Sequence, residues 1–242
     1  MASLLLMHVG ACYCMAAIRA NCRETFSAAD FAFIAESLVG GETAAAEVTT
    51  LLQDPDALDA ALESDRLFRS VLELPRNVAV SSQLYFYVLV RHMLARFDRV
   101  VADYVANVLA TFVHTRRMRT LPDQPGVNLD YISDMLIALK SASSEREFLI
   151  RVQVGNYSLF LAGVFPQHIQ HRAARHGAPE IGFYEEVGSQ NYRRAADHRL
   201  ARGYALVETY RTIADRFSEV RVGLNQMTDR LICLETSRGP LS

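Results

Sequence analysis

The strongest constraint in this sequence is a regular apolar repeat near its C-terminal end. Apolar residues recur there at alternating gaps of four and three, at Leu206, Tyr210, Ile213, Phe217, Val220, Leu224, Met227, Leu231 and Leu234. Such heptad spacing keeps one stripe of a helix apolar along its whole length. It predicts one long C-terminal helix that lies against the rest of its own chain or against a second copy.

The apolar stripe of this predicted helix narrows along its length. Val207 and Ala214 widen the stripe in the first half, whereas Arg221 and Thr228 occupy the matching positions in the second half. A wide apolar face suits burial inside a helical bundle. We therefore expect the first half to be buried and the second half to bind a protein partner or a second copy in a homodimer.

The rest of the chain also predicts helices. Of its 242 residues, 50% are hydrophobic and 21% are charged, which is typical of a globular protein. The apolar run at 84–90 is rich in β-forming residues, but its pattern continues through Phe97 and no second strand is available to pair with it. We therefore favour a buried helix there, paired with a second helix that ends near residue 113. The predicted fold class is all-α, a single multi-helix bundle domain with a central antiparallel helical hairpin at 84–113 and the long C-terminal heptad-patterned helix.

Local signals mark several helix boundaries in the sequence. Helix starts are predicted at Ser27, at Asp54-Pro55 and at the capping box Ser144-x-x-Glu147. A break is predicted at Phe165-Pro166, because the residue before proline is driven out of the helical conformation. The proline-containing stretch 121–128 predicts a loop within the domain, and Gly155 and Gly163 predict close approach by a neighbouring helix.

Two segments follow from these patterns: residues 1–24, a poorly ordered or dispensable N-terminal segment, and residues 25–242, an all-helical domain. The uncharged start has no basic n-region, and His8 interrupts its short apolar run, so neither a signal peptide nor a membrane anchor is favoured. Three of the four cysteines fall within the first 22 residues, which does not suit a disulfide framework spread over a fold. These features predict a cytoplasmic protein.

The most concentrated polar chemistry lies between residues 168 and 198. His168 and His171 share one face of a predicted helix, and the next helix begins near Tyr184 and Glu185. Two imidazoles and one carboxylate from Glu185 or Glu186 would suit a metal ion or a small ligand. The alternative is a solvated helix face with no ligand.

Arg91 and His92 interrupt the most apolar predicted helix of the chain. A buried arginine needs a partner, which the sequence offers as Asp98, Asp103 or a carboxylate on another helix. Structural pairing is favoured over a role in gripping a ligand, but both residues remain candidate ligand-binding residues.

A second group of arginines could bind an anion. Its members are Arg116, Arg117, Arg119, Arg193 and Arg194. The first three also complement a helix dipole, because they follow the end of a predicted helix. The formal net charge of −2 gives no general attraction to nucleic acid, so a nucleic-acid partner is disfavoured.

Motifs typical of enzymes are missing from the sequence. It has no Gly-x-Ser-x-Gly elbow, no Glu-x-x-His pair and no phosphate-binding glycine loop that ends in lysine. No cofactor is predicted. We therefore expect an interaction or regulatory protein that works through helical surfaces. The alternative is a metal-binding or small-ligand-binding protein with a site around His168, His171, Tyr184 and Glu185.

Overall fold

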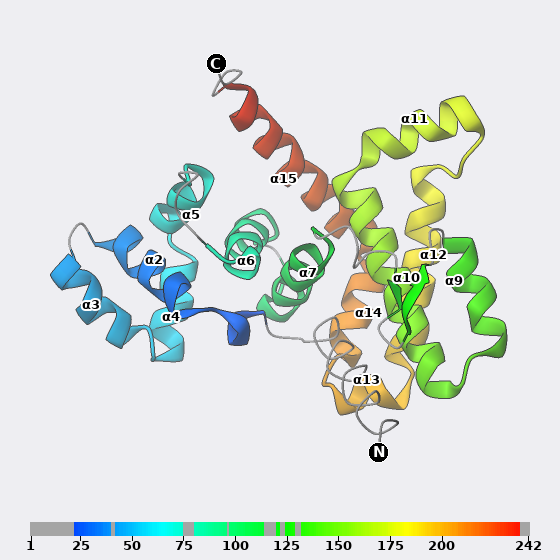
Figure 1. Ribbon diagram of the computed structural model, residues 1–242, viewed down its shortest axis with the longest axis horizontal. Helices are drawn as coiled ribbons and strands as arrows, with labels where there is room; N and C mark the ends of the chain where they lie inside the picture. The colour runs from blue at the N-terminus through cyan, green and yellow to red at the C-terminus, as the bar shows by residue number, and fades with distance from the viewer. Residues whose placement is uncertain are drawn as a thin grey trace. The chain divides into compact units, whose positions relative to one another are not determined.

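The computed structural model describes residues 22–39, 42–74, 80–95, 97–113, 120–121, 124–128 and 132–237. Helices make up almost all of this described part (Figure 1). One short antiparallel pair of strands interrupts them, β1 (Thr120–Leu121) and β2 (Gln124–Asn128). The predicted all-α fold class is confirmed, whereas the stretch predicted as a loop contains this small β pair.

The described residues fall into two compact units. One lies within Asn107–Asn225, and the other within Asn21–Ala106 and Gln226–Ser242. The unit boundaries fall inside α7 (Arg99–Phe112) and α15 (Phe217–Ser237). The predicted N-terminal segment lies outside the described residues except for its last three positions, 22–24.

The unit within Asn21–Ala106 begins with a short 3₁₀ turn, η1, followed by five helices and most of α7. These elements are η1 (Arg23–Thr25), α2 (Ala28–Leu38), α3 (Glu42–Leu51), α4 (Pro55–Leu62), α5 (Asp65–Leu72) and α6 (Ser82–Met93). Ser27 caps α2 through a capping box with Asp30, and Asp54 caps α4 by accepting from the backbone N–H groups of Asp56 and Ala57. Both predicted helix starts are thus confirmed.

The carboxylate of Asp30 connects α2 to α6. It is fully buried and accepts hydrogen bonds from the backbone N–H groups of Ser27, at 2.7 Å, and Ser81, at 2.8 Å. Ser81 in turn caps α6 through its side chain. The apolar run at 84–90 therefore forms a helix, as its continuing periodicity predicted.

The unit within Asn107–Asn225 is organised around a long helix in its core. Its helices are α9 (Ile132–Ala138), η2 (Leu139–Ser141), α10 (Ser144–Val164), α11 (Pro166–His176), α12 (Ile181–Ala196), α13 (Arg199–Gly203), α14 (Val207–Asp215) and the first part of α15. α10 packs along α12, and α12 packs along α14 (Figure 1). The cap of α10 is Ser143 rather than the predicted Ser144, because the side chain of Ser143 accepts from the N–H of Arg146.

Small residues allow the close approach of α10 to its neighbours. A Cβ atom at Gly155 would lie 3.0 Å from the ring of Tyr192, and one at Gly163 would lie 2.7 Å from Leu224 Cδ1. The hydroxyl of Tyr192 donates to Asn156 Oδ1 at 2.7 Å inside this core. The close approach predicted at both glycines is confirmed.

The C-terminal seam is buried as far as Met227, but it does not form one helix. Leu206, Tyr210, Ile213, Phe217, Val220, Leu224 and Met227 are each at most 3% exposed. The backbone leaves the helical conformation at Arg216, with φ −116° and ψ 27°, so the seam is divided between α14 and α15. The prediction of a single continuous helix was wrong, because apolar periodicity reports the buried face and not the continuity of the backbone hydrogen bonds.

The second half of the seam was expected to bind a partner, yet part of it lies within its own chain. Met227 and Leu231 lie beside Phe68 and Leu72 of α5 and beside Leu89 and Met93 of α6. Met227 is 3% exposed, so this position is not free for a second copy. Side chains beyond Leu231 lie outside the description, and a partner there stays a prediction.

The bend at Phe165 separates α10 from α11 by 92°. The predicted break at Phe165-Pro166 is confirmed, since α11 starts at Pro166. Among the described helices, none is long and apolar enough by itself to cross a membrane; α10 and α11 meet that length and composition only as this bent pair.

Asn225 of α15 stabilises the end of α10. Its side-chain amide donates to the carbonyl oxygens of Ala162, at 2.9 Å, and Gly163, at 2.6 Å. Carbonyls in the last turn of a helix have no partner within that helix, so these two bonds satisfy groups that the bend would otherwise leave unpaired. The oxygen of the same amide accepts from Arg221 at 2.6 Å.

Replacing Asn225 with alanine is expected to lower the free energy of unfolding by about 1 to 2 kcal/mol, because two carbonyls lose their donor. Denaturation followed by circular dichroism measures this change. Asn225→Asp keeps the acceptor for Arg221 but loses the donor, so it should be destabilised as well. Gln226→Ala, at the exposed neighbouring position, should leave stability unchanged. Equal stability of all three variants would contradict the assigned role.

Candidate functional site

The residues predicted around positions 168–185 do not converge on one site. His168 and His171 are exposed on α11. Glu185 of α12 forms an ion pair with Arg221, with 2.5 Å between Oε1 and Nε. Across the described residues, no group of three His, Cys, Asp or Glu side chains is placed to hold a metal ion. The metal set of His168, His171 and Glu185 is therefore not assembled, because its carboxylate is already paired.

Tyr184 lies beside an apolar cluster. It packs, partly buried, against Ile132, Met135, Ile150 and Val154. Burial raises the pKa of its phenol above the ordinary value, with the Arg172 guanidinium acting in the opposite direction. The hydroxyl therefore remains protonated at neutral pH and contributes to packing.

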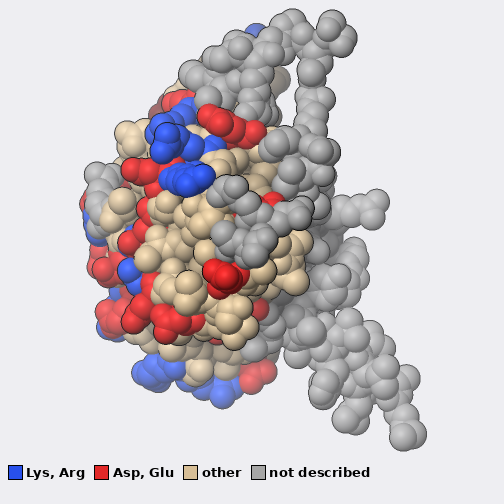
Figure 2. All heavy atoms as spheres, turned by 90° about the vertical axis from the view of Figure 1, so that its left-hand side faces the viewer, with Lys and Arg blue, Asp and Glu red and all other residues tan. Residues whose placement is uncertain are grey.

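The predicted anion-binding arginines give no shared surface in the described residues. Arg193 pairs with Asp215 at 2.9 Å, and Arg194 is exposed on the same helix. Arg116, Arg117 and Arg119 lie outside the described residues. Figure 2 shows basic, acidic and uncharged side chains lying among one another on the face it presents. Such a mixture of charges is typical of a solvated protein surface.

Ser144 and His198 form a pair that the sequence analysis missed. Ser144 Oγ lies 2.9 Å from His198 Nε2, a distance that invites a nucleophile-and-base interpretation. However, His198 Nδ1 accepts the backbone N–H of Leu200 at 3.2 Å, so in the neutral ring the proton is on Nε2. Nε2 then donates to the hydroxyl and cannot take its proton. His198 therefore caps α13 and does not activate Ser144 as a nucleophile.

Arg91 and His92 are adjacent in α6 but lie in different environments. Consecutive helical residues project about 100° apart. Arg91 donates to Glu63 Oε1 through Nη2 at 2.8 Å and to the Phe97 carbonyl at 3.2 Å. The carboxylate on another helix expected for Arg91 is thus supplied by Glu63, at the end of α4. The Arg91 guanidinium lowers the pKa of Glu63.

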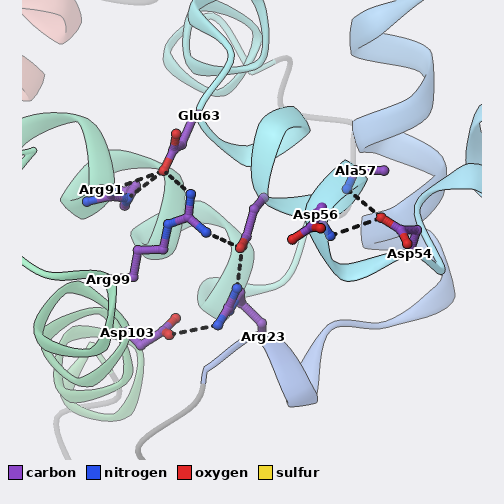
Figure 3. A network of polar contacts seen from close by, with 9 residues as sticks. Arg23, Asp54, Asp56, Ala57, Glu63, Arg91, Arg99 and Asp103 are labelled. Carbon is purple, nitrogen blue, oxygen red and sulfur yellow. Dashed lines mark hydrogen bonds and ion pairs between the residues drawn. The ribbon is translucent and has the colours of Figure 1, made fainter.

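Arg91 belongs to a network of three arginines and three carboxylates (Figure 3). Arg99 pairs with both Glu63 and Asp59, and Arg23 pairs with both Asp59 and Asp103. The network joins η1, α4, α6 and α7 within one unit. Each charged group has an opposite charge beside it, so the network has a structural role and connects these elements.

Asp103 is the most deeply buried member of this network. Its side chain is 4% exposed, Oδ2 lies 3.3 Å from Arg23 Nη2, and Oδ1 is buried with no hydrogen-bond partner among the described residues. Burial raises the pKa of Asp103 to about 7, and the Arg23 guanidinium offsets only part of this effect. Burial, together with the charge on Asp103, also raises the pKa of the neighbouring Tyr87 phenol.

His92 lines a hollow of about 460 Å³ in the same unit. The other lining residues are Asp65, Phe68 and Arg69 of α5, Met93 of α6 and Arg230 of α15. Neither Arg69 nor Arg230 forms an ion pair with any described residue, whereas the network arginines do. Apart from a hydrogen bond from Arg69 Nε to the Asp65 carbonyl oxygen at 3.3 Å, no hydrogen bond to a described residue engages these two guanidiniums, so most of their N–H groups remain available to a ligand.

The imidazole of His92 is held in one orientation. Its ring stacks on Phe68, with 4.3 Å between ring centroids and 7° between planes. Nδ1 lies 2.9 Å from the carbonyl oxygen of Val88 and therefore carries the proton, since a carbonyl only accepts. Nε2 is buried and has no hydrogen-bond partner in the described structure. The Arg230 guanidinium lies 5.3 Å above the Phe68 ring.

His92 was a candidate predicted from the sequence, whereas Arg69 and Arg230 were not. Both are exposed helical arginines, and no local pattern connects α5 with α15. Only the packing of Met227 and Leu231 against α5 and α6 brings Arg230 to the hollow. Comparison with known proteins supplies no relative with which to interpret this geometry, since no protein-family model, no curated protein and no solved structure matches the chain.

Proposed function

We propose that this chain is a helical protein that binds a small anion in the hollow beside His92. The observation that carries the proposal is the combination of an unpartnered imidazole Nε2 with two guanidiniums that form no ion pair among the described residues. Buried polar atoms normally have a partner, so an orphaned one at a hollow suggests a ligand. A volume of about 460 Å³ suits a small molecule.

The arginines determine the charge of the ligand in this proposal. A guanidinium presents several fixed donors that match the oxygens of a carboxylate or phosphate. Asp65 is the one carboxylate among the described lining residues, so the two arginines leave an excess of positive charge. Phe68 is 8% exposed and is covered by His92 and Arg230, which leaves little of its ring for a ligand to stack on.

Binding of inorganic phosphate, measured by isothermal titration calorimetry at low ionic strength, tests this proposal. Arg230→Gln is expected to weaken binding about tenfold, because it removes one charge-assisted contact of about 1.5 kcal/mol. Arg66→Gln is the matched control, since Arg66 is exposed on α5 and does not line the hollow. Absence of saturable binding, or an equal loss in the Arg66 variant, would overturn the proposal.

A second candidate function is the interaction role expected from the sequence. It is supported by large apolar side chains that are exposed on the described surface, notably Leu51 at 63%, Ile137 at 61% and Phe183 at 39%. In this proposal the antiparallel hairpin at 84–113 and α15 provide a rigid scaffold, and residues beyond Leu231 bind a partner or a second copy. Cys22, a buried free thiol, supports a reducing, cytoplasmic location.

Light scattering over a range of protein concentrations tests the homodimer. A mass that rises to twice that of the monomer, and that truncation after Leu231 returns to the monomer value, supports it. A monomer mass at every concentration removes the homodimer from the proposal.

A further inference from the structure

We infer that the hollow beside His92 selects an oxyanion that carries a proton, and so binds phosphate in preference to sulfate. This inference rests on the proposed function, because it specifies the ligand of the same site. It follows from the donors and acceptors that the lining side chains offer.

Arg69 and Arg230 only donate hydrogen bonds, and each carries a positive charge. They favour any small anion of suitable size, including phosphate, sulfate and carboxylates. Alone, two guanidiniums therefore give little discrimination between phosphate and sulfate, which share size and tetrahedral shape.

His92, in contrast, contributes a hydrogen-bond acceptor. Its Nδ1 proton is already donated to the Val88 carbonyl, which leaves the Nε2 lone pair as an acceptor. In this proposal Nε2 therefore accepts a hydrogen bond from the ligand.

Phosphate can donate this hydrogen bond, but sulfate cannot. At neutral pH inorganic phosphate keeps at least one P–O–H group, whereas sulfate is fully deprotonated. A sulfate oxygen would face the Nε2 lone pair with a lone pair of its own and would leave Nε2 unsatisfied. An unsatisfied buried acceptor costs about 1 to 3 kcal/mol, which corresponds to about a tenfold to hundredfold difference in affinity.

Contact between an anion and Nε2 requires a rearrangement of the hollow. Nε2 is shielded from water, and Arg230 is exposed and lies over the Phe68 ring on which His92 also stacks. In our proposal Arg230 moves from this ring onto the anion, which then lies against the edge of the imidazole. The same arginine then holds the charge while the imidazole recognises the proton.

Titration of the full chain with inorganic phosphate, sulfate and methyl phosphate at pH 7.5 tests this inference. Inorganic phosphate is expected to bind at least tenfold more tightly than sulfate. Methyl phosphate, whose second pKa is about 6, is mostly deprotonated at this pH and should behave like sulfate. Methyl phosphate binding as tightly as inorganic phosphate would show that the proton is not recognised.

A variant of His92 tests the role of Nε2 as the hydrogen-bond acceptor. His92→Phe keeps a ring to stack on Phe68 but removes Nε2, so phosphate and sulfate should bind equally to within twofold. His176→Phe, at an exposed histidine of α11, is the matched control and should keep the preference. Circular dichroism checks that each variant folds; if His92→Phe does not fold, the methyl phosphate comparison on the wild type decides.

The outcomes separate the inference from the proposed function. If wild type binds phosphate and sulfate equally, the site binds anions but the inference is overturned. If neither anion binds, the proposed function fails first. A phosphate preference that persists in a folded His92→Phe variant would show that another group recognises the proton.

Discussion

Replacing Gly188 with alanine is expected to lower the free energy of unfolding by about 3 kcal/mol. A Cβ atom at this position of α12 would lie 2.6 Å from two carbons of the Phe217 ring and 2.9 Å from Ser158 Cβ. Phe217 is 3% exposed and Ser158 is fully buried, so neither neighbour has free space to enter. The extra methyl group must therefore separate α12 from α10 or from α15.

Chemical denaturation followed by circular dichroism measures this effect. Gly182→Ala is the matched control on the same helix, because no atom lies within 4 Å of a Cβ there. Alanine favours the helical conformation over glycine, so this variant should be unchanged or up to about 1 kcal/mol more stable. Equal stability of the two variants would show that α12 does not pack as closely as the structure indicates.

Gly188 also illustrates which parts of the fold could be predicted from the sequence. Gly155 and Gly163 attracted attention because they lie in a long apolar helix, and both do contact a neighbour closely. Gly188 lies in a more polar stretch, and its neighbour Phe217 is far away in the sequence. The apolar repeat predicted the buried face of α14 and α15, but not the break at Arg216, since that depends on the local backbone.

The candidate site was predictable only in part, for a similar reason. Arg91 and His92 were noticeable because polar residues interrupt an apolar helix. The arginines that complete the hollow, Arg69 and Arg230, look like ordinary surface residues, and tertiary packing alone brings them together. The histidines of α11 shared a helix face as predicted, but the carboxylate that would have joined them, Glu185, pairs with Arg221.

Replacing Asp103 with asparagine is expected to remove a large part of the pH dependence of stability between about pH 4 and pH 7. The carboxyl has a pKa of about 7 in the folded protein, against an ordinary value of 3.8 in the unfolded chain. Between these values the folded state holds a proton that the unfolded state has lost. Stability therefore falls as pH rises through this window, by up to about 1.4 kcal/mol per pH unit.

Asparagine stays neutral at every pH, and it resembles the protonated carboxyl in size. The Asp103→Asn variant should therefore match wild type near pH 4 and exceed its stability by about 3 to 4 kcal/mol at pH 8, where the buried charge is fully formed. Arg23 keeps its ion pair with Asp59 in the variant, so no unpaired guanidinium is created. This decrease in stability with rising pH is unusual, because a paired carboxylate normally stabilises a protein more as pH rises. It arises because the cost of burying the charged carboxylate of Asp103 is larger than the stabilisation that the charge of Arg23 provides.

Urea denaturation at each pH unit from 4 to 8, for wild type and variant, measures the difference between the two curves. Asp229→Asn is the control, since Asp229 is exposed and should give a curve parallel to that of wild type. Another carboxylate of the network, Glu63, has the opposite pH dependence: its pKa is lowered, so its contribution to stability grows as pH rises and partly opposes that of Asp103. Parallel curves for wild type and Asp103→Asn would mean that the Arg23 guanidinium compensates the burial of Asp103 fully, and that the network is balanced at every pH.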